Sequence, residues 1–202
     1  MNQTIQKMKT ALSAYYNKAK EISPVIDRMK KELLPDVAAE RAEKLYQDLN
    51  AIRYNAKEQI RSAAAEGRAA AEKWGMLNGS DLTDDAKLLQ AGLTLTQKDF
   101  DDLCLKYKNN GSMCRLLAEY AEKQNQRVIP ADPDQAIDTF SDDTALKSVL
   151  LTKNLMTVDK KLDLWDRLES SAQMILSAVD SEGVSDYSVT YSVEHFGENV
   201  ED

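Results

Sequence analysis

The sequence has few of the residue types from which catalytic and metal sites are built. Its 202 residues include one histidine and two cysteines, and without a second histidine or a cysteine pair at metal-ligand spacing we expect no zinc site. It contains neither a Walker motif nor the glycine pattern of a dinucleotide-binding turn. We therefore expect a protein that is not an enzyme and that uses no catalytic residue, no metal ion and no other cofactor.

Turn-forming residues are also scarce, with 7 glycines and 4 prolines. A chain with so few turn formers favours long elements, and its low content of β-branched and aromatic residues before position 180 favours helices. Hydrophobic residues make up 43% and charged residues 30%, which is enough for a packed core beside a charged surface. The predicted fold class is all-α.

Long apolar runs are missing as well. No stretch approaches 18 consecutive apolar residues, so we expect no transmembrane span and no membrane partner. Residues 1–18 lack the apolar core of a signal peptide, which predicts a cytoplasmic location. Cys104 and Cys114 are too few for a disulfide scaffold, and we interpret them as small buried apolar residues. A regulatory disulfide between them is the alternative.

What the chain does contain is a heptad pattern in its first 74 residues. One run covers residues 3–33 with steps of three and four, and a second, rich in alanine, covers residues 38–74. Such spacing is typical of helices that pair along a narrow seam. We predict a coiled-coil-like arm over residues 1–74, and the seam residues that we expect to mediate self-association or partner-helix binding are Ile5, Met8, Leu12, Tyr15, Ile22, Ile26, Met29, Leu33, Leu45, Leu49, Ile52 and Trp74.

Two prolines bear on how the arm folds. At Ser23-Pro24, either the helix kinks or Ser23 caps a new helix, and the unbroken apolar phase favours a kink. The phase shifts after Leu34-Pro35-Asp36, which predicts the true break there. The two helices then either fold back as an antiparallel hairpin or continue as a bent rod that pairs only in an oligomer.

We predict a helical body over residues 75–179, interrupted by a loop at 125–141, and an acidic extended tail over 180–202. Gly75 is the expected left-handed cap of the second long helix. Thr96 and Asp99 have the spacing of a capping box, and Ser112 is the expected cap of a later helix. The acidic residues from Asp132 to Asp143 partly match a calcium loop, but Ile137 stands where glycine is required, so helix caps explain them better. In the tail, alternation of tyrosine and valine from Tyr187 to Val193 predicts one strand.

Charge is unevenly distributed along the chain. Residues 1–74 carry 14 basic and 10 acidic residues, whereas residues 75–202 carry 12 basic and 24 acidic residues. A basic arm and an acidic body suit head-to-tail self-association or a partner that recognises one end, although both can also be ordinary solvated helix faces. The basic residues are interleaved with acidic ones and form no stripe, so we expect no direct nucleic-acid binding.

Several segments together resemble small helical proteins of tailed phages and prophages of Gram-positive bacteria. They are the heptad-rich N-terminus, WGMLNGSDLTDDAKLLQAG at 74–92, LLAEYAEKQN at 116–125 and SVEHFGENVED at 192–202. The resemblance covers the organisation of most of the chain and includes no diagnostic motif. Among such phage proteins, acidic elongated helical chains are often capsid scaffolding or other virion-assembly factors that self-associate through coiled coils.

The sequence therefore leads to two hypotheses of function. The first is a non-enzymatic assembly or protein-interaction factor that acts through helical self-association or partner-helix binding, in the host bacterial cytoplasm if the chain is phage-encoded. The alternative is a phage-encoded inhibitor that binds a host defence enzyme or nucleic-acid enzyme through its acidic surface. The expected partners are proteins in both cases, and in the first the partner includes the chain itself.

Overall fold

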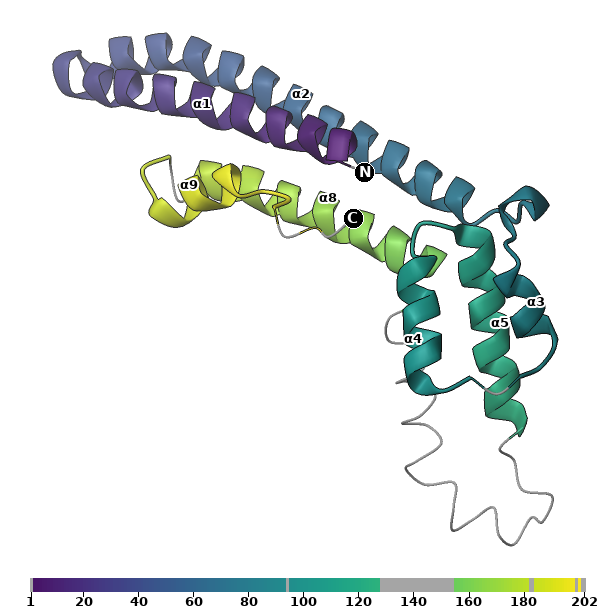
Figure 1. Ribbon diagram of the computed structural model, residues 1–202. Coiled ribbons are helices and arrows are strands. Elements are labelled where there is room, and N and C mark those ends of the chain that lie inside the picture. Colours follow the sequence, from purple (N-terminus) through teal and green to yellow (C-terminus); the bar gives the residue numbers. More distant parts are fainter. Residues whose placement is uncertain (1, 94, 128–154, 182–183, 199, 201–202) are drawn as a thin grey trace, which may run out of the picture. The chain divides into compact units, whose positions relative to one another are not determined.

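The computed structural model describes residues 2–93, 95–127, 155–181, 184–198 and 200. The prediction of an all-α fold is confirmed, and the described residues contain no strand. The elements are α1 (Asn2–Glu32), α2 (Pro35–Trp74), the 3₁₀ helix η1 (Gly79–Asp81), α3 (Asp85–Gln90), α4 (Gln97–Lys106), α5 (Gly111–Arg127), α8 (Val158–Ser181) and α9 (Tyr187–Glu194) (Figure 1). They belong to two compact units, a bundle unit of Met1–Ala69 and Asp163–Asp202, and a middle unit of Ala70–Leu162.

The first helix runs through its proline without interruption. Pro24 lies inside α1, and the hydroxyl of Ser23 donates a hydrogen bond of 2.8 Å to the carbonyl of Ala19, one turn earlier. That bond gives the Ser23 side chain a partner at the turn where proline removes a backbone donor. The interpretation in which Ser23 caps a new helix is therefore wrong.

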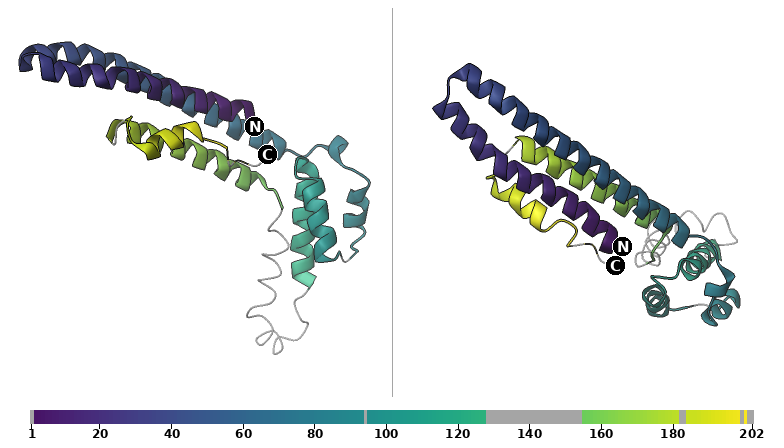
Figure 2. Two further views of the ribbon diagram at one scale, coloured as in Figure 1. Left: turned by 60° about the vertical axis from the view of Figure 1, so that its left-hand side comes forward. Right: turned by 90° about the horizontal axis from the view of Figure 1, so that it is seen from above.

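The predicted break after α1 is present. α1 ends at Glu32 and α2 begins at Pro35, where proline is tolerated because the first helical N–H has no intrahelical partner. The two helices then run side by side as an antiparallel hairpin (Figure 2). Of the two arrangements that the sequence allowed, the structure has the hairpin and not the bent rod.

In the bundle unit, α8 packs along the hairpin as a third helix, and α9 lies against α1 (Figures 1 and 2). The core side chains of α8 repeat at helical spacing, and they are Trp165, Leu168, Ala172, Ile175, Leu176 and Val179. In the same unit, Ile5, Met8 and Leu12 of α1 and Ile60 and several alanines of α2 are also buried. The bulky side chains of α8 thus fill the space that the small residues of α2 leave.

The predicted division into arm, body and tail differs from these units. Residues 163–179, expected in the body, pack on the hairpin, because α8 continues as one helix from the middle unit into the bundle unit. The expected extended tail contains α9, which begins at Tyr187. Asp186 caps it, because its carboxylate accepts hydrogen bonds from the backbone N–H groups of Ser188 and Val189. Val189, Val193 and Phe196 are buried at helical spacing, so the strand prediction is wrong.

The middle unit has its own core. Its buried members are Ala86, Leu89, Phe100, Cys104, Tyr107, Met113, Cys114, Leu117, Tyr120, Ala121 and Leu155. The capping box of Thr96 and Asp99 is present at the start of α4, as predicted. The predicted 125–141 loop and the partial calcium pattern lie outside the described residues, except that α5 extends to Arg127.

Two predicted caps in the middle unit have other roles. Asn110, and not Ser112, caps α5, because its side-chain oxygen accepts a hydrogen bond of 3.0 Å from the N–H of Met113. The buried hydroxyl of Ser112 instead accepts from the N–H of Asn78. Gly75 does not adopt a left-handed conformation. It is required for space, since a Cβ there would lie 2.1 Å from Cγ2 of Val158.

Candidate protein-interaction surface

The predicted interaction residues fall into three groups in the structure. Six are buried inside the bundle unit, namely Ile5, Met8, Leu12, Tyr15, Ile22 and Ile26. Five are only partly buried, namely Met29, Leu33, Leu45, Leu49 and Ile52. Trp74 belongs to the middle unit, where it packs against the core of that unit. The structure therefore places the first eleven along one seam of the hairpin and separates Trp74 from them.

The contacts of α8 identify the face of α2 on which a third helix packs. The ring of Trp165 lies against Gly67, where an added Cβ would be 2.2 Å from the indole. Further along α8, the carboxylate of Asp180 forms an ion pair of 2.6 Å with the guanidinium of Arg53. Gly67 and Arg53 are fourteen positions apart, which is two heptads, so they share one helical face. One heptad before Arg53, the same face reaches Tyr46, which is 41% exposed.

The same argument applies to α1. The hydroxyl of Tyr15 donates a hydrogen bond to the carboxylate of Asp180 near the end of α8. Ile22 and Met29 follow Tyr15 at intervals of seven and continue its face. Ile22 is buried in a small cluster with Ile26 and Ala42, whereas Met29 is only partly buried.

Asp180 accepts a hydrogen bond from Tyr15 and forms an ion pair with Arg53. These two contacts mark the level at which the three-helix bundle ends. Tyr15 is 2% exposed, and burial followed by the hydrogen bond to Asp180 raises the pKa of its hydroxyl, so that it remains a donor at physiological pH. Together, Tyr15, Arg53 and Asp180 join α1, α2 and α8 at one level. α8 ends one residue later, at Ser181.

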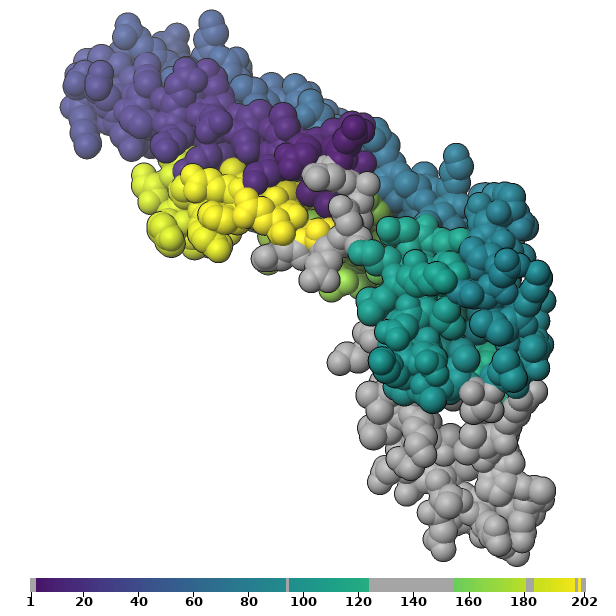
Figure 3. All heavy atoms as spheres, in the orientation of Figure 1, coloured from purple at the N-terminus to yellow at the C-terminus, as the bar shows by residue number. Residues whose placement is uncertain are grey.

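Beyond this level, the hairpin has only its own two helices. We call residues 17–52 the hairpin tip. The space-filling view shows atoms of α8 and α9 beside the first part of α1, and atoms of α1 and α2 alone at the far end (Figure 3). Apolar side chains there are exposed, including Leu34 at 75% and Tyr46 at 41%. Among the described residues, the face that α8 covers elsewhere is thus left without a third helix at the tip.

Ion pairs also join α8 to the hairpin. Residues 1–69 carry 13 basic and 9 acidic residues, whereas residues 163–202 carry 1 basic and 10 acidic residues. The guanidinium of Arg68 pairs with Asp166 at 2.8 Å and with Glu169, and these two carboxylates, Glu169 first, raise the pKa of Arg68. Three basic residues of the hairpin, Lys9, Arg53 and Arg68, therefore pair with acidic residues of the same chain.

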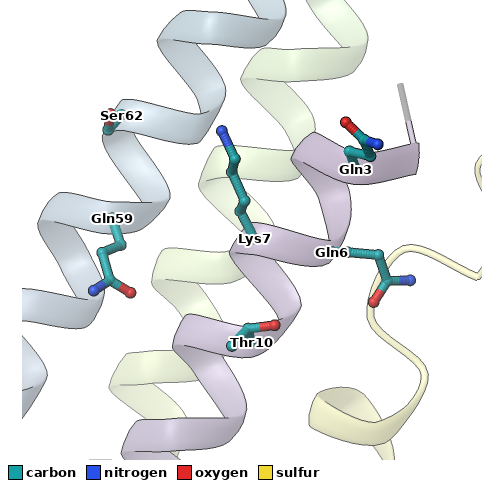
Figure 4. A pocket seen from close by; sticks show the side chains of 6 residues that line it. All are labelled: Gln3, Gln6, Lys7, Thr10, Gln59 and Ser62. Carbon is teal, nitrogen blue, oxygen red and sulfur yellow. The ribbon is translucent and has the colours of Figure 1, made fainter.

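A groove between α1 and α2 provides a second surface. Its volume is about 830 Å³, and it is lined by Gln3, Gln6, Lys7, Thr10, Gln59 and Ser62 (Figure 4). The ammonium of Lys7 reaches across it to Glu66 at 2.5 Å. The residues that line it are exposed and polar, but most of the surface that they present to the groove is apolar, because the aliphatic parts of their side chains face it.

A third surface lies between α8 and α9. This groove of about 490 Å³ is lined by apolar residues such as Leu168, Ile175 and Phe196, together with three serines. The single histidine, His195, stands at its edge with its ring stacked on Tyr191 at a centroid distance of 4.0 Å, and its Nδ1 lies 3.0 Å from the Tyr191 carbonyl. The arrangement holds the imidazole against α9, and the hydroxyl of Ser192 in the same groove donates a hydrogen bond of 2.8 Å to the carbonyl of Ser188.

Both thiols of the middle unit are buried and free. Burial raises the pKa of Cys104 to about 12 and that of Cys114 to about 11, from an ordinary value of 9.0. The thiol of Cys114 also donates to the carbonyl of Tyr107 at 3.2 Å. Thiols held in the neutral form are poor nucleophiles, which fits the interpretation as buried apolar residues.

These pKa values predict a loss of stability at alkaline pH. The thiols of the unfolded chain ionise from pH 9 upward, whereas the folded unit keeps them neutral, so unfolding becomes more favourable as the pH rises towards 11. The urea midpoint of the middle unit should therefore fall between pH 8.5 and 10.5. The control is the variant Cys104→Ala/Cys114→Ala, in which that part of the decrease should be absent. An identical pH profile in both proteins would contradict the prediction.

Among the helices that the structure describes, none is both long enough and apolar enough to cross a lipid bilayer. The described residues likewise contain no group of three or more His, Cys, Asp or Glu side chains placed to bind a metal ion. Comparison with protein-family models, with curated proteins and with solved structures finds no match to this chain.

Proposed function

We propose that this chain is a non-enzymatic protein-interaction factor of the kind used in phage virion assembly, and that the hairpin tip docks a helix of its partner. The observation that carries the proposal is the continuation of the α8-covered face to Met29 and Tyr46, past the residue at which α8 ends. A helix from another molecule would pack there as α8 packs on the rest of the hairpin.

The energetics favour a partner at the tip. A hairpin of two helices buries only part of its seam, and full burial of one large apolar side chain stabilises by about 1.5–3 kcal/mol. Half of that gain from each of Met29, Leu33, Leu45, Tyr46 and Leu49 is about 4–8 kcal/mol. Association costs at least about 4 kcal/mol in lost freedom of motion, so we expect a weak contact that becomes effective when many copies assemble.

Charge pairing favours this function over an inhibitor that acts through an acidic surface. Asp166, Glu169 and Asp180 are engaged with Arg68 and Arg53 of the same chain, and Glu198 pairs with Lys9. A basic partner would have to displace these contacts.

The test uses a helix that already fits this face. A fluorescently labelled peptide of residues 158–181, the sequence of α8, should bind the full chain with a dissociation constant in the micromolar range, measured by anisotropy. The variant Met29→Glu/Tyr46→Glu places charge on the open seam, and we expect it to weaken binding at least tenfold.

A matched control makes the same chemical change elsewhere. Met76 and Leu105 are 67% and 61% exposed and lie in the middle unit, so Met76→Glu/Leu105→Glu should bind the peptide as the native chain does. Circular dichroism and the fluorescence of the two tryptophans, Trp74 and Trp165, verify that both variants fold. Equal affinity of the two variants would count against the tip as the docking site.

A further inference from the structure

We infer that the partner of the hairpin tip is the tip of a second copy of this chain, packed antiparallel about a two-fold axis to form a short four-helix bundle. This inference rests on the proposed function of the tip and adds the identity of the partner. It is carried by the length of the open seam, by its charge and by the position of α8.

The open seam has nearly the same length on both helices. Between the Tyr15–Asp180–Arg53 level and the turn, α1 contributes residues 17–32 and α2 contributes residues 35–52. About 17 residues at 1.5 Å each make a seam of up to about 26 Å. The tip of a second copy has the same dimensions. In an antiparallel pair, the turn of each copy would therefore reach the end of α8 in the other copy.

Charge on the tip is balanced, unlike charge on the rest of the chain. Residues 17–52 carry 7 basic and 7 acidic residues, while the whole chain has a net charge of −8. Two tips can therefore meet without net electrostatic repulsion, although the whole chain is acidic.

The position of α8 selects the antiparallel arrangement. α8 lies on the same face as the open seam and ends at Ser181. In a parallel pair, the two α8 helices would meet between the hairpins and hold the tips apart. In an antiparallel pair, each tip continues the line of the other copy's α8, so one apolar face is covered from end to end. In a two-fold interface each seam side chain is buried in both copies. The buried apolar area is therefore twice what one tip contributes, which offsets the small number of exposed apolar residues.

The experiment measures molar mass by light scattering after size exclusion, from about 1 μM to 500 μM. The native chain should pass from monomer to dimer with rising concentration, and Met29→Glu/Tyr46→Glu should shift the midpoint at least tenfold upward. The control Met76→Glu/Leu105→Glu should dimerise as the native chain does. Met29→Gln/Tyr46→Gln is a milder pair, used if the glutamate variant does not fold.

Crosslinking tests the antiparallel arrangement. If the two tips overlap over their full length, the two-fold axis passes near residue 25 of α1 and between residues 43 and 44 of α2. Two copies of residue 46 then lie about 8 Å apart along the bundle, and two copies of residue 34 about 27 Å apart. A bis-maleimide of about 10 Å should link Tyr46→Cys to itself and should not link Leu34→Cys, and the native chain with its buried thiols is the control. Linking of Leu34→Cys alone would overturn the antiparallel overlap.

The outcomes separate this inference from the proposed function. A native chain that stays monomeric at every concentration, yet binds the 158–181 peptide through the tip, would overturn the second copy as partner and leave partner-helix docking in place. A dimer that persists unchanged in both tip variants would overturn both, because self-association would then use another surface.

Discussion

Replacing Trp165 by alanine is expected to lower the free energy of unfolding of the bundle unit by about 3–5 kcal/mol. Trp165 is 4% exposed, and its ring lies flat against the backbone of α2 at Gly67. Truncation removes the largest side chain of the α8 face and leaves a cavity that rigid helices on both sides cannot close. Urea unfolding followed by circular dichroism measures the loss.

The same contact predicts that Gly67→Ala destabilises the native chain but stabilises the Trp165→Ala variant. In the native chain, Gly67→Ala would place a methyl group 2.2 Å from the Trp165 ring, and such overpacking costs about 1–3 kcal/mol. Alanine also stabilises a helix interior by about 1 kcal/mol relative to glycine, so the net result should be destabilising. In the Trp165→Ala background the methyl group enters the cavity, and the substitution should stabilise by about 1 kcal/mol.

A nearby position calibrates this comparison. Ala69 is exposed on α2, two residues from Gly67, and Ala69→Gly measures the helix-propensity term alone, with an expected cost of about 1 kcal/mol. Equal effects of Gly67→Ala in the two backgrounds would show that the indole and the glycine are not coupled. That result would remove the explanation of why a glycine is tolerated inside α2, seven residues before the end of the helix.

The long helices were predictable because their signal is repetitive. The heptad steps from Ile5 to Leu33 continue through Pro24, and the phase shift at Pro35 identifies the turn, so the helices and their break follow from the sequence. The choice between hairpin and rod did not follow, because a seam pattern is the same whether the partner helix belongs to the same chain or to another.

α9 was missed because two periods overlap in its sequence. Tyr187, Val189, Tyr191 and Val193 alternate with polar residues as a strand does, but Val189, Val193 and Phe196 also have helical spacing. A signal for the helix was present in Asp186 followed by Ser188, a common N-cap sequence. Packing decided between the two, since in a helix these three side chains are buried together.

The candidate surface was predicted in part. The seam residues were identified, but a pattern does not show how much of the seam a third helix covers, and that depends on where α8 ends. Tyr46 was not among the predicted interaction residues because it lies one position from the Leu45–Leu49 seam. Tyr46 is assigned to the face that α8 covers because it lies one heptad before Arg53, and the contact of Arg53 with α8 is visible only in the structure.

The largest effect on the middle unit is expected from Gly111→Ala. A Cβ at Gly111 would lie 1.8 Å from the carbonyl oxygen of Trp74, so the start of α5 would be driven into the last residue of α2. Because the obstacle is backbone and not the end of a flexible side chain, relief requires one helix to move. We expect a loss of about 3 kcal/mol in the free energy of unfolding.

Gly79 supplies the matched control, because a Cβ there meets no atom within 4 Å and its backbone is not in the left-handed region. Gly79→Ala should therefore change stability by no more than about 0.5 kcal/mol. Hydrogen exchange measured on peptides from residues 97–123 reports the middle unit directly, and peptides from α1 should exchange as in the native chain if the two units unfold separately. Native protection of residues 97–123 in Gly111→Ala would mean that the contact between Gly111 and Trp74 does not determine how the middle unit packs.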